Sequence, residues 1–133
     1  YKRQDIGYKL GCGATTTNLR RVSQGRFSVD SAFQIDDVSQ ISIISLEEAV
    51  DFLPGLLLSD SESINVLLGR QIYAGGVAGI LGKFAKDEII RIVGSDERLI
   101  AIARSERTSS FVKTLLTRGS VERVAKLVKV LGA

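Results

Sequence analysis

Two apolar runs on either side of a turn constrain the fold of this chain most strongly. The runs Glu88–Val93 and Leu99–Ala103 are rich in β-branched residues, and Gly94-Ser95-Asp96-Glu97 separates them, which predicts a β-hairpin. Upstream, the apolar segment Val77–Leu81 is punctuated by residues typical of tight barrel turns: Gly75, Gly76, Gly79 and Gly82. The pattern therefore predicts a small β-rich barrel or pseudo-barrel in the second half of the chain.

Helix signals precede and interrupt these strands. Ser45-Leu46-Glu47-Glu48 and Ser59-Asp60-Ser61-Glu62 both have the spacing of a capping box, so each predicts the start of a helix. The first helix is expected to end before Pro54, the only proline. Ile64, Leu67 and Leu68 are expected on one face of the second helix, which Gly69 terminates. Leu56–Ser59, between the two helices, is predicted to be extended.

The N-terminal segment predicts a helix followed by a short hairpin. Gly11 is the expected stop of a helix that includes Asp5–Leu10. Thr15–Thr17 and Leu19–Val22 are predicted to be extended, Ser23–Gly25 to form a turn, and Phe27–Val29 to form the returning strand. Asp30 is predicted to cap a helical turn at Ser31–Phe33, and Ile41–Ile44 to be extended.

The last residues are ambiguous between helix and strand. Val121, Val124, Leu127, Val128 and Leu131 follow helical spacing, and Ser120 is a plausible cap. Because valine also favours strands, the strand remains an alternative, but the spacing predicts a helix over residues 120–132.

Charge is distributed unevenly along the 133 residues, whose net charge is +3. Residues 1–26 hold six Lys/Arg and one acid, and residues 27–69 hold eight acids and no base. From Arg70 onward there are twelve bases and six acids. Basic segments that meet on one face attract nucleic acid, whereas scattered ones only solvate the surface.

Several kinds of chemistry are excluded or disfavoured by composition. The chain has no histidine and one cysteine, so it contains no Ser–His or Cys–His catalytic pair, zinc site or internal disulfide. Gly82-Lys83-Phe84 lacks the Ser or Thr of a phosphate loop, and Cys12 is expected to be a packing residue. We expect no metal at the acidic span of Asp36, Asp37, Glu47, Glu48 and Asp51, no cofactor, and no membrane span.

Two motifs carry a resemblance to a known family. Asp5-Ile6-Gly7-x-x-Leu10-Gly11-Cys12-Gly13-Ala14, followed by Leu19-Arg20-Arg21, Gly25 and Phe27, resembles the C-terminal part of bacterial tRNA pseudouridine-55 synthases, the TruB family. Asp60 through Leu68-Gly69-x-x-Ile72, with the hairpin Ile89–Ala103, is similar to that family's PUA-like RNA-binding domain. The resemblance implies an α+β chain: the end of a pseudouridine-synthase catalytic domain in residues 1–54, then a small β-rich PUA-like pseudo-barrel in residues 55–133.

The activity that the resemblance implies is isomerisation of a tRNA T-loop uridine to pseudouridine by the full-length enzyme. Such enzymes extrude the uridine, break its glycosidic bond and rejoin the base through carbon. The family's nucleophilic aspartate lies in a Gly-x-Leu-Asp-Pro type motif that this chain lacks, so we assign no catalytic residue. Tyr1-Lys2-Arg3 imitates the family's Tyr-x-Arg motif at the wrong spacing, and Tyr1–Gln4 is interpreted as a possible scar at the start of a fragment.

The resemblance also implies which residues meet the substrate. Leu19 matches the leucine that lines the uridine pocket, although without the resemblance it is an ordinary core leucine. Arg20 and Arg21 compete for one phosphate-facing position because neighbours on a strand point to opposite faces. Weaker phosphate candidates are Lys9, Arg26 and Arg70, and Lys83 and Lys86 are candidates for the acceptor stem.

Three hypotheses follow for the function of the chain. The first is a cytoplasmic, monomeric tRNA pseudouridine synthase, of which this chain completes the uridine pocket and binds the T-loop and acceptor stem of tRNA. The alternatives are a stand-alone RNA-binding module and a structural or protein-interaction domain. The match over Asp5–Phe27 favours the first, because it belongs to a catalytic domain.

Overall fold

The structure is a computed structural model that describes residues 2–36 and 43–131. Its contacts divide the chain into two compact units, Tyr1–Ser42 and Ile43–Ala133, each of which is described by itself. The predictions that involve Tyr1, Asp37 or Ile41 lie outside the described residues.

The first unit consists of a helix and a short hairpin. Its elements are α1 (Lys2–Leu10), β1 (Ser23–Gln24) and β2 (Phe27–Ser28). Gly11 ends the helix as predicted, in the left-handed conformation with φ 69° and with its N–H bonded to the carbonyl oxygen of Tyr8 at 3.2 Å. The helix starts at Lys2, three residues earlier than Asp5, where the motif begins.

The hairpin differs from the prediction in its details. The turn is centred on Gly25 and Arg26, because Ser23 and Gln24 already pair with β2. Residues 13–22 contain no strand, so the extended segments predicted there have no ladder partner among the described residues. Ser28, not Asp30, caps the following turn, because its hydroxyl accepts a hydrogen bond from the N–H of Asp30 at 3.2 Å.

Among its described residues, the first unit buries only Gly7. A Cβ atom at Gly7 would lie 2.7 Å from the backbone N of Ala14, so only glycine permits this close approach of the chain to the helix. The large apolar side chains of the unit, including Ile6 and Leu10, are exposed. A segment that buries so little apolar surface gains little hydrophobic stabilisation by itself.

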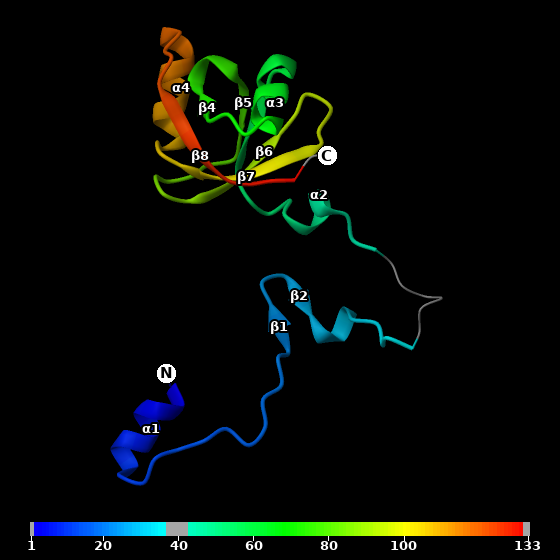
Figure 1. Ribbon diagram of the computed structural model, residues 1–133, viewed down its shortest axis with the longest axis vertical. Coiled ribbons are helices and arrows are strands. Elements are labelled where there is room, and N and C mark those ends of the chain that lie inside the picture. The colour runs from blue at the N-terminus through cyan, green and yellow to red at the C-terminus, as the bar shows by residue number, and fades with distance from the viewer. Residues whose placement is uncertain (1, 37–42, 132–133) are drawn as a thin grey trace. The chain divides into compact units, whose positions relative to one another are not determined.

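The second unit is a curled six-stranded sheet with two main helices (Figure 1). The strand order is β4-β8-β7-β6-β3-β5. The elements are α2 (Leu46–Ala49), β3 (Gly55–Leu58), α3 (Asp60–Leu67), β4 (Ile72–Tyr73), β5 (Val77–Leu81), β6 (Ile89–Val93), β7 (Leu99–Ser105), α4 (Ser109–Arg118) and β8 (Arg123–Val130). The predicted hairpin is confirmed as β6 and β7, and the predicted β-rich pseudo-barrel with it.

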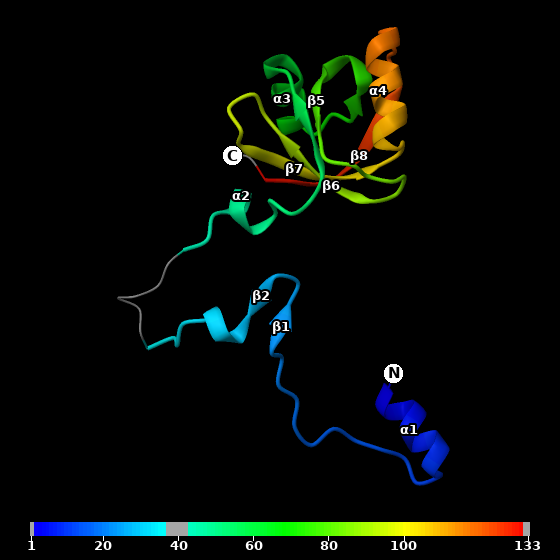
Figure 2. The ribbon, with the colours of Figure 1, turned by 180° about the vertical axis from the view of Figure 1, so that it is seen from behind.

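The hydrophobic core lies between the sheet and the two helices. Val66 of α3 and Val112 of α4 are fully buried, as are Leu56 and Leu58 of β3 and Ile92 of β6. Figures 1 and 2 show α3 and α4 on the same side of β6, β7 and β8, so the opposite side of these strands is left without either helix.

Strand β3 joins the two parts of the sheet. It pairs antiparallel with β5 and parallel with β6, where Gly55 lies opposite Arg91. A Cβ atom at Gly55 would lie 2.3 Å from the carbonyl oxygen of Arg91. Glycine is therefore required at the first position of the strand.

The two capping-box predictions had different outcomes. Ser45 caps α2, and its hydroxyl accepts from the N–H of Glu48 at 3.1 Å. Ser59 holds the cap position of α3, but its hydroxyl makes no capping hydrogen bond and lies 3.3 Å from that of Ser61. The capping box predicted there is therefore absent.

The predicted apolar face of α3 is wrong. Ile64, Leu67 and Leu68 are exposed by 60%, 43% and 73%, whereas Val66 is fully buried. The helix is only two turns long, and strands of the barrel decide which side faces the core.

The helix predicted over residues 120–132 is also wrong. The described part of this segment contains β8, which pairs with β7 and with β4. The irregularity in the β4–β8 ladder between Arg123 and Ala125 leaves Val124 and Ala125 both in the core, and a second one in the β7–β8 ladder lies between Leu127 and Lys129. Together they break the strict alternation of a strand and produce an apparently helical spacing.

Substitutions on α3 test the observed orientation of that helix. Val66→Ala is expected to lower the free energy of unfolding by about 1–3 kcal/mol, because it removes buried methyl groups and leaves a cavity. Ile64→Ala, on the exposed side, is expected to change it by less than about 0.5 kcal/mol. Urea denaturation measures both, and the reverse order would contradict this orientation.

Candidate nucleic-acid interface

A basic groove lies between the β5–β6 connection and the first turn of α4. The groove has a volume of about 770 Å³. Its lining is Ile80, Gly82, Lys83, Phe84, Ala85, Glu88, Thr108, Ser109, Ser110 and Lys113. We name this the α4 groove.

Hydrogen bonds fix the β5–β6 connection against α4. The hydroxyl of Ser109 accepts from the N–H of Phe84 at 3.3 Å, and the N–H of Ser109 donates to the carbonyl oxygen of Phe84 at 3.0 Å. The Phe84 side chain is only 5% exposed and anchors the connection in the core. The exposed Lys83 and Lys86 on either side of Phe84 are therefore carried by a fixed backbone.

The other end of the connection is bonded to β7. Ser105, fully buried, donates its hydroxyl to the carbonyl oxygen of Ala85 at 2.5 Å, and its backbone carbonyl accepts from the N–H of Asp87 at 2.9 Å. The carboxylate of Glu88 accepts a hydrogen bond from the N–H of Ala85 at 2.7 Å. That contact occupies the one acidic side chain of the groove.

A smaller hollow of about 230 Å³ adjoins the groove beyond Thr108. It is lined by Lys86, Glu106, Arg107, Thr108 and Phe111. The Arg107 guanidinium lies 5.9 Å from the centre of the Phe111 ring, which is 42% exposed. An exposed aromatic ring beside two cations is a suitable surface for a nucleobase and its phosphate.

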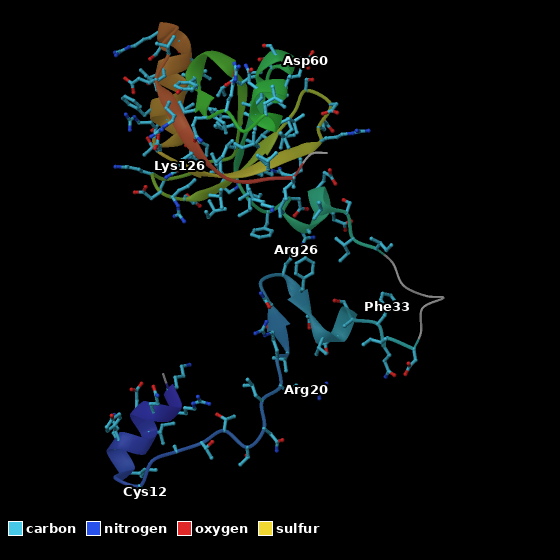
Figure 3. All side chains as sticks on the ribbon, in the orientation of Figure 1. Cys12, Arg20, Arg26, Phe33, Asp60 and Lys126 are labelled. Carbon is cyan, nitrogen blue, oxygen red and sulfur yellow. The ribbon has the colours of Figure 1, made fainter. Side chains whose placement is uncertain are left out.

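The predicted residues of the first unit lie on exposed parts of that unit. Leu19 is 92% exposed, so the unit by itself forms no pocket around this side chain. Arg20 follows it in the irregular segment (Figure 3). Arg21 donates to the side-chain oxygen of Gln24. Lys9 lies in the last turn of α1, and Arg26 lies in the β1–β2 turn.

The predicted residues of the second unit fall into two places. Lys83 and Lys86 lie together at the α4 groove and its neighbouring hollow. Arg70 lies apart from them, after α3, where its guanidinium donates to the side-chain oxygen of Asn65 at 3.3 Å.

The basic residues of α4 were not among the predicted site residues, because no element was predicted over Ser109–Arg118. Signals for the helix are present. The hydroxyl of Thr108 caps it by accepting from the N–H of Phe111 at 3.3 Å, and Gly119 ends it with φ 63°. The buried Val112 and Leu115 are spaced as one helical face, which places Lys113 at the groove.

Neither a metal centre nor a membrane span emerges from the described ranges. Residues 2–36 and 43–131 contain no cluster of three or more side chains suited to holding a metal ion. No helix in these ranges has the length and apolar character needed to cross a bilayer.

Comparison with known families divides the chain near the start of the barrel. Residues 56–128 match the model of the PUA domain, and residues 3–61 match that of the tRNA pseudouridylate synthase B C-terminal domain. The chain belongs to the PUA domain family. The resemblance stated from the sequence motifs is thereby confirmed for both segments.

Relatives of known name extend along nearly the whole chain. It is 36% identical over 95% of its length to tRNA pseudouridine synthase B of Thermotoga petrophila. It is 29% identical over 84% of its length to the probable tRNA pseudouridine synthase B of Thermoplasma acidophilum. The chain spans 42% and 35% of these two proteins.

Solved structures support the same fold. An H/ACA RNP bound to a substrate RNA containing 2'-deoxyuridine gives a TM-score of 0.71 at 23% identity, over 100% of this chain and 47% of that one. A PUA domain from Aeropyrum pernix gives 0.60 at 17% identity, over 65% of this chain and 51% of that one. The α+β fold with a PUA-type barrel is confirmed.

Beside the α4 groove, the PUA domain holds a paired carboxylate. Glu106 accepts two hydrogen bonds from Arg123, at 2.6 and 2.7 Å. These bonds lower the pKa of Glu106, and the charges of Arg107 and Lys126 contribute in the same direction. The same pair raises the pKa of Arg123, so its guanidinium stays charged and Glu106 balances that charge.

Glu106→Gln tests this pair through the pH dependence of stability. Because the pKa of Glu106 is lower in the folded than in the unfolded chain, the pair stabilises the fold above the unfolded value of about 4.3. This contribution disappears as pH falls through the lowered folded pKa. At pH 7 the variant should be less stable by up to about 1 kcal/mol, with the difference vanishing in acid. Thermal unfolding between pH 2 and 7 measures this; a difference independent of pH would contradict the assignment.

Proposed function

We propose that this chain supplies the tRNA-binding part of a tRNA pseudouridine-55 synthase. In this proposal residues 1–54 are the end of the catalytic domain and residues 55–133 are the PUA domain. The full-length enzyme, a cytoplasmic monomer, isomerises a T-loop uridine. The relatives named tRNA pseudouridine synthase B, which match over both units, support this assignment.

The α4 groove is the observation that carries the RNA-binding role. Its two exposed lysines, Lys83 and Lys113, and Lys86 of the neighbouring hollow are combined with a backbone that is already fixed by hydrogen bonds. A preordered cationic groove binds phosphates with little loss of conformational entropy. We assign the acceptor stem of tRNA to this groove, since backbone contacts suffice for double-stranded RNA.

The first unit has a different role in the proposal. Leu19 lines the pocket of the extruded uridine, and its exposure supports a contact with groups outside its own unit. Arg20 or Arg21 contacts a phosphate of the T-loop, with Lys9, Arg26 and Arg70 as further phosphate contacts. Arg21, which also bonds Gln24, is the less available of the first two.

A stand-alone RNA-binding module is the second candidate. The buried apolar side chains all lie between Leu56 and Ala125, so the described second unit contains a complete core of its own. The described residues of the first unit, which a synthase requires as well, form no such hydrophobic core. A stand-alone module would need the second unit alone.

Lys83→Gln/Lys86→Gln tests the groove by tRNA binding. Removal of two phosphate contacts should reduce the slope of log affinity against log salt by about 2. Fluorescence anisotropy with a labelled tRNA transcript measures this. The matched control is Arg98→Gln/Arg118→Gln, which removes the same charge from exposed positions outside the groove. Equal losses in both variants, or a wild-type affinity independent of salt, would contradict the proposal.

The chain by itself is expected not to isomerise uridine, because it lacks the family's aspartate motif. Tritium release from tRNA labelled at C5 of uridine measures this reaction. Turnover by the purified chain would show that the nucleophile lies within these residues.

A further inference from the structure

The six strands of the PUA sheet contain no acidic residue. Their segments hold five bases: Arg91, Arg104, Arg123, Lys126 and Lys129. The acids of the domain lie in the helices and connections instead. The charge of the sheet is therefore entirely positive.

Strand register places most of these bases on the side of the sheet that faces away from α3 and α4. Side chains directly opposite on paired strands share a face, and so do residues two apart on one strand. Arg104 lies opposite Lys126, and Ile102, two residues before Arg104, lies opposite Lys129. Ile102 also lies opposite Arg91 on β6. The buried Ala101, Ala103 and Ser105 alternate with these positions and face the core. We name Arg104, Lys126 and Lys129 the sheet triad.

The triad is short of counter-charges. No ion pair joins any of its members to an acid in the part of the chain that the structure describes. Glu106, the acid whose pKa Lys126 influences, is already bonded twice to Arg123. Like charges directly opposite on paired strands destabilise a sheet, and the partner that the fold offers Arg104 is a backbone carbonyl oxygen, not an acid.

Lysines at an open sheet edge also discourage aggregation, and β4 covers only the first half of β8. That role explains Lys126 and Lys129 without a ligand. It does not explain Arg104, because β7 is an interior strand between β6 and β8.

The triad is continuous with the α4 groove. Arg104 donates to the carbonyl oxygen of Asp87 at 2.8 Å, and Asp87 follows Lys86 directly in the β5–β6 connection. A row of cations therefore leads from Lys86 through Arg104 to Lys126 and Lys129. Lys126 and Lys129 lie opposite Arg104 and Ile102, two residues apart on β7, so they are separated by about 7 Å along the sheet.

We infer that the sheet triad binds the phosphodiester backbone of the same RNA that occupies the α4 groove. This inference rests on the proposed function. A row of separated cations matches a chain of regularly spaced phosphates better than it matches a single small anion. The neighbouring Ile89 and Ile102 offer no hydrogen bonds for reading bases, so this contact is independent of sequence.

Lys126→Gln/Lys129→Gln tests the inference by RNA binding. Both side chains are exposed, so the variant should fold, and its melting temperature checks this. The slope of log affinity against log salt should fall by about 2 for a tRNA transcript and equally for an unrelated 20-base-pair RNA duplex. Arg98→Gln/Arg118→Gln again controls for net charge.

The outcomes separate this inference from the proposed function. Loss of binding in Lys83→Gln/Lys86→Gln with none in Lys126→Gln/Lys129→Gln overturns the triad alone. Absence of salt-dependent RNA binding in the wild-type chain overturns both. Increased aggregation of Lys126→Gln/Lys129→Gln with unchanged RNA affinity would assign the two lysines to protection of the sheet edge. Tighter binding of polyglutamate than of RNA would assign the triad to an acidic protein partner. Either result overturns the inference.

Discussion

The parallel pairing of β3 with β6 is the contact on which the rest of the barrel depends. β3 is the only strand, among those described, that joins β5 to the sheet. Gly55 permits this pairing because its missing Cβ leaves room for the carbonyl oxygen and the side-chain stem of Arg91. Leu56 and Leu58, on the same strand, are fully buried, so backbone pairing and core packing are established together.

This arrangement also positions the candidate interface. β5 and β6 are both neighbours of β3, so the connection between them is held at both ends by one strand. Phe84 then fixes its middle in the core, and the hydrogen bonds to Ser105 and Ser109 fix its backbone. The cations of the α4 groove are thus held by the same contacts that close the barrel.

Sequence predicted the elements whose signals are local. β6 and β7 are apolar runs on either side of a short polar connection, and Ser45 caps a helix with its neighbours in sequence. Two local caps, at Asp30 and Ser59, were nevertheless wrong, and the larger errors concern elements decided by distant partners. β8 follows the irregular ladders of β4 and β7, and the side of α3 that is buried depends on the barrel.

The candidate site was predictable to a similar extent. Lys83 and Lys86 could be selected because they flank a barrel turn in a basic segment, but Lys113 and Arg104 could not. Their neighbourhood depends on α4 and on the register of β7 with β8. Leu19 was identified by its motif alone, since its own unit buries nothing around it.

The position of β8 in the sheet has a consequence for biosynthesis. β4 has no strand partner among the described residues except β8, so Ile72 pairs with Ala125, far along the chain. A ribosome therefore releases β4, β5, β6 and β7 before the strand that holds β4 exists. Contacts of such wide sequence separation slow folding, and the edge of β7 stays open until translation reaches residue 130. Until β8 is made, β4 and the outer edge of β7 therefore both lack a strand partner, and the charge of Arg104 on β7 discourages edge-to-edge association there.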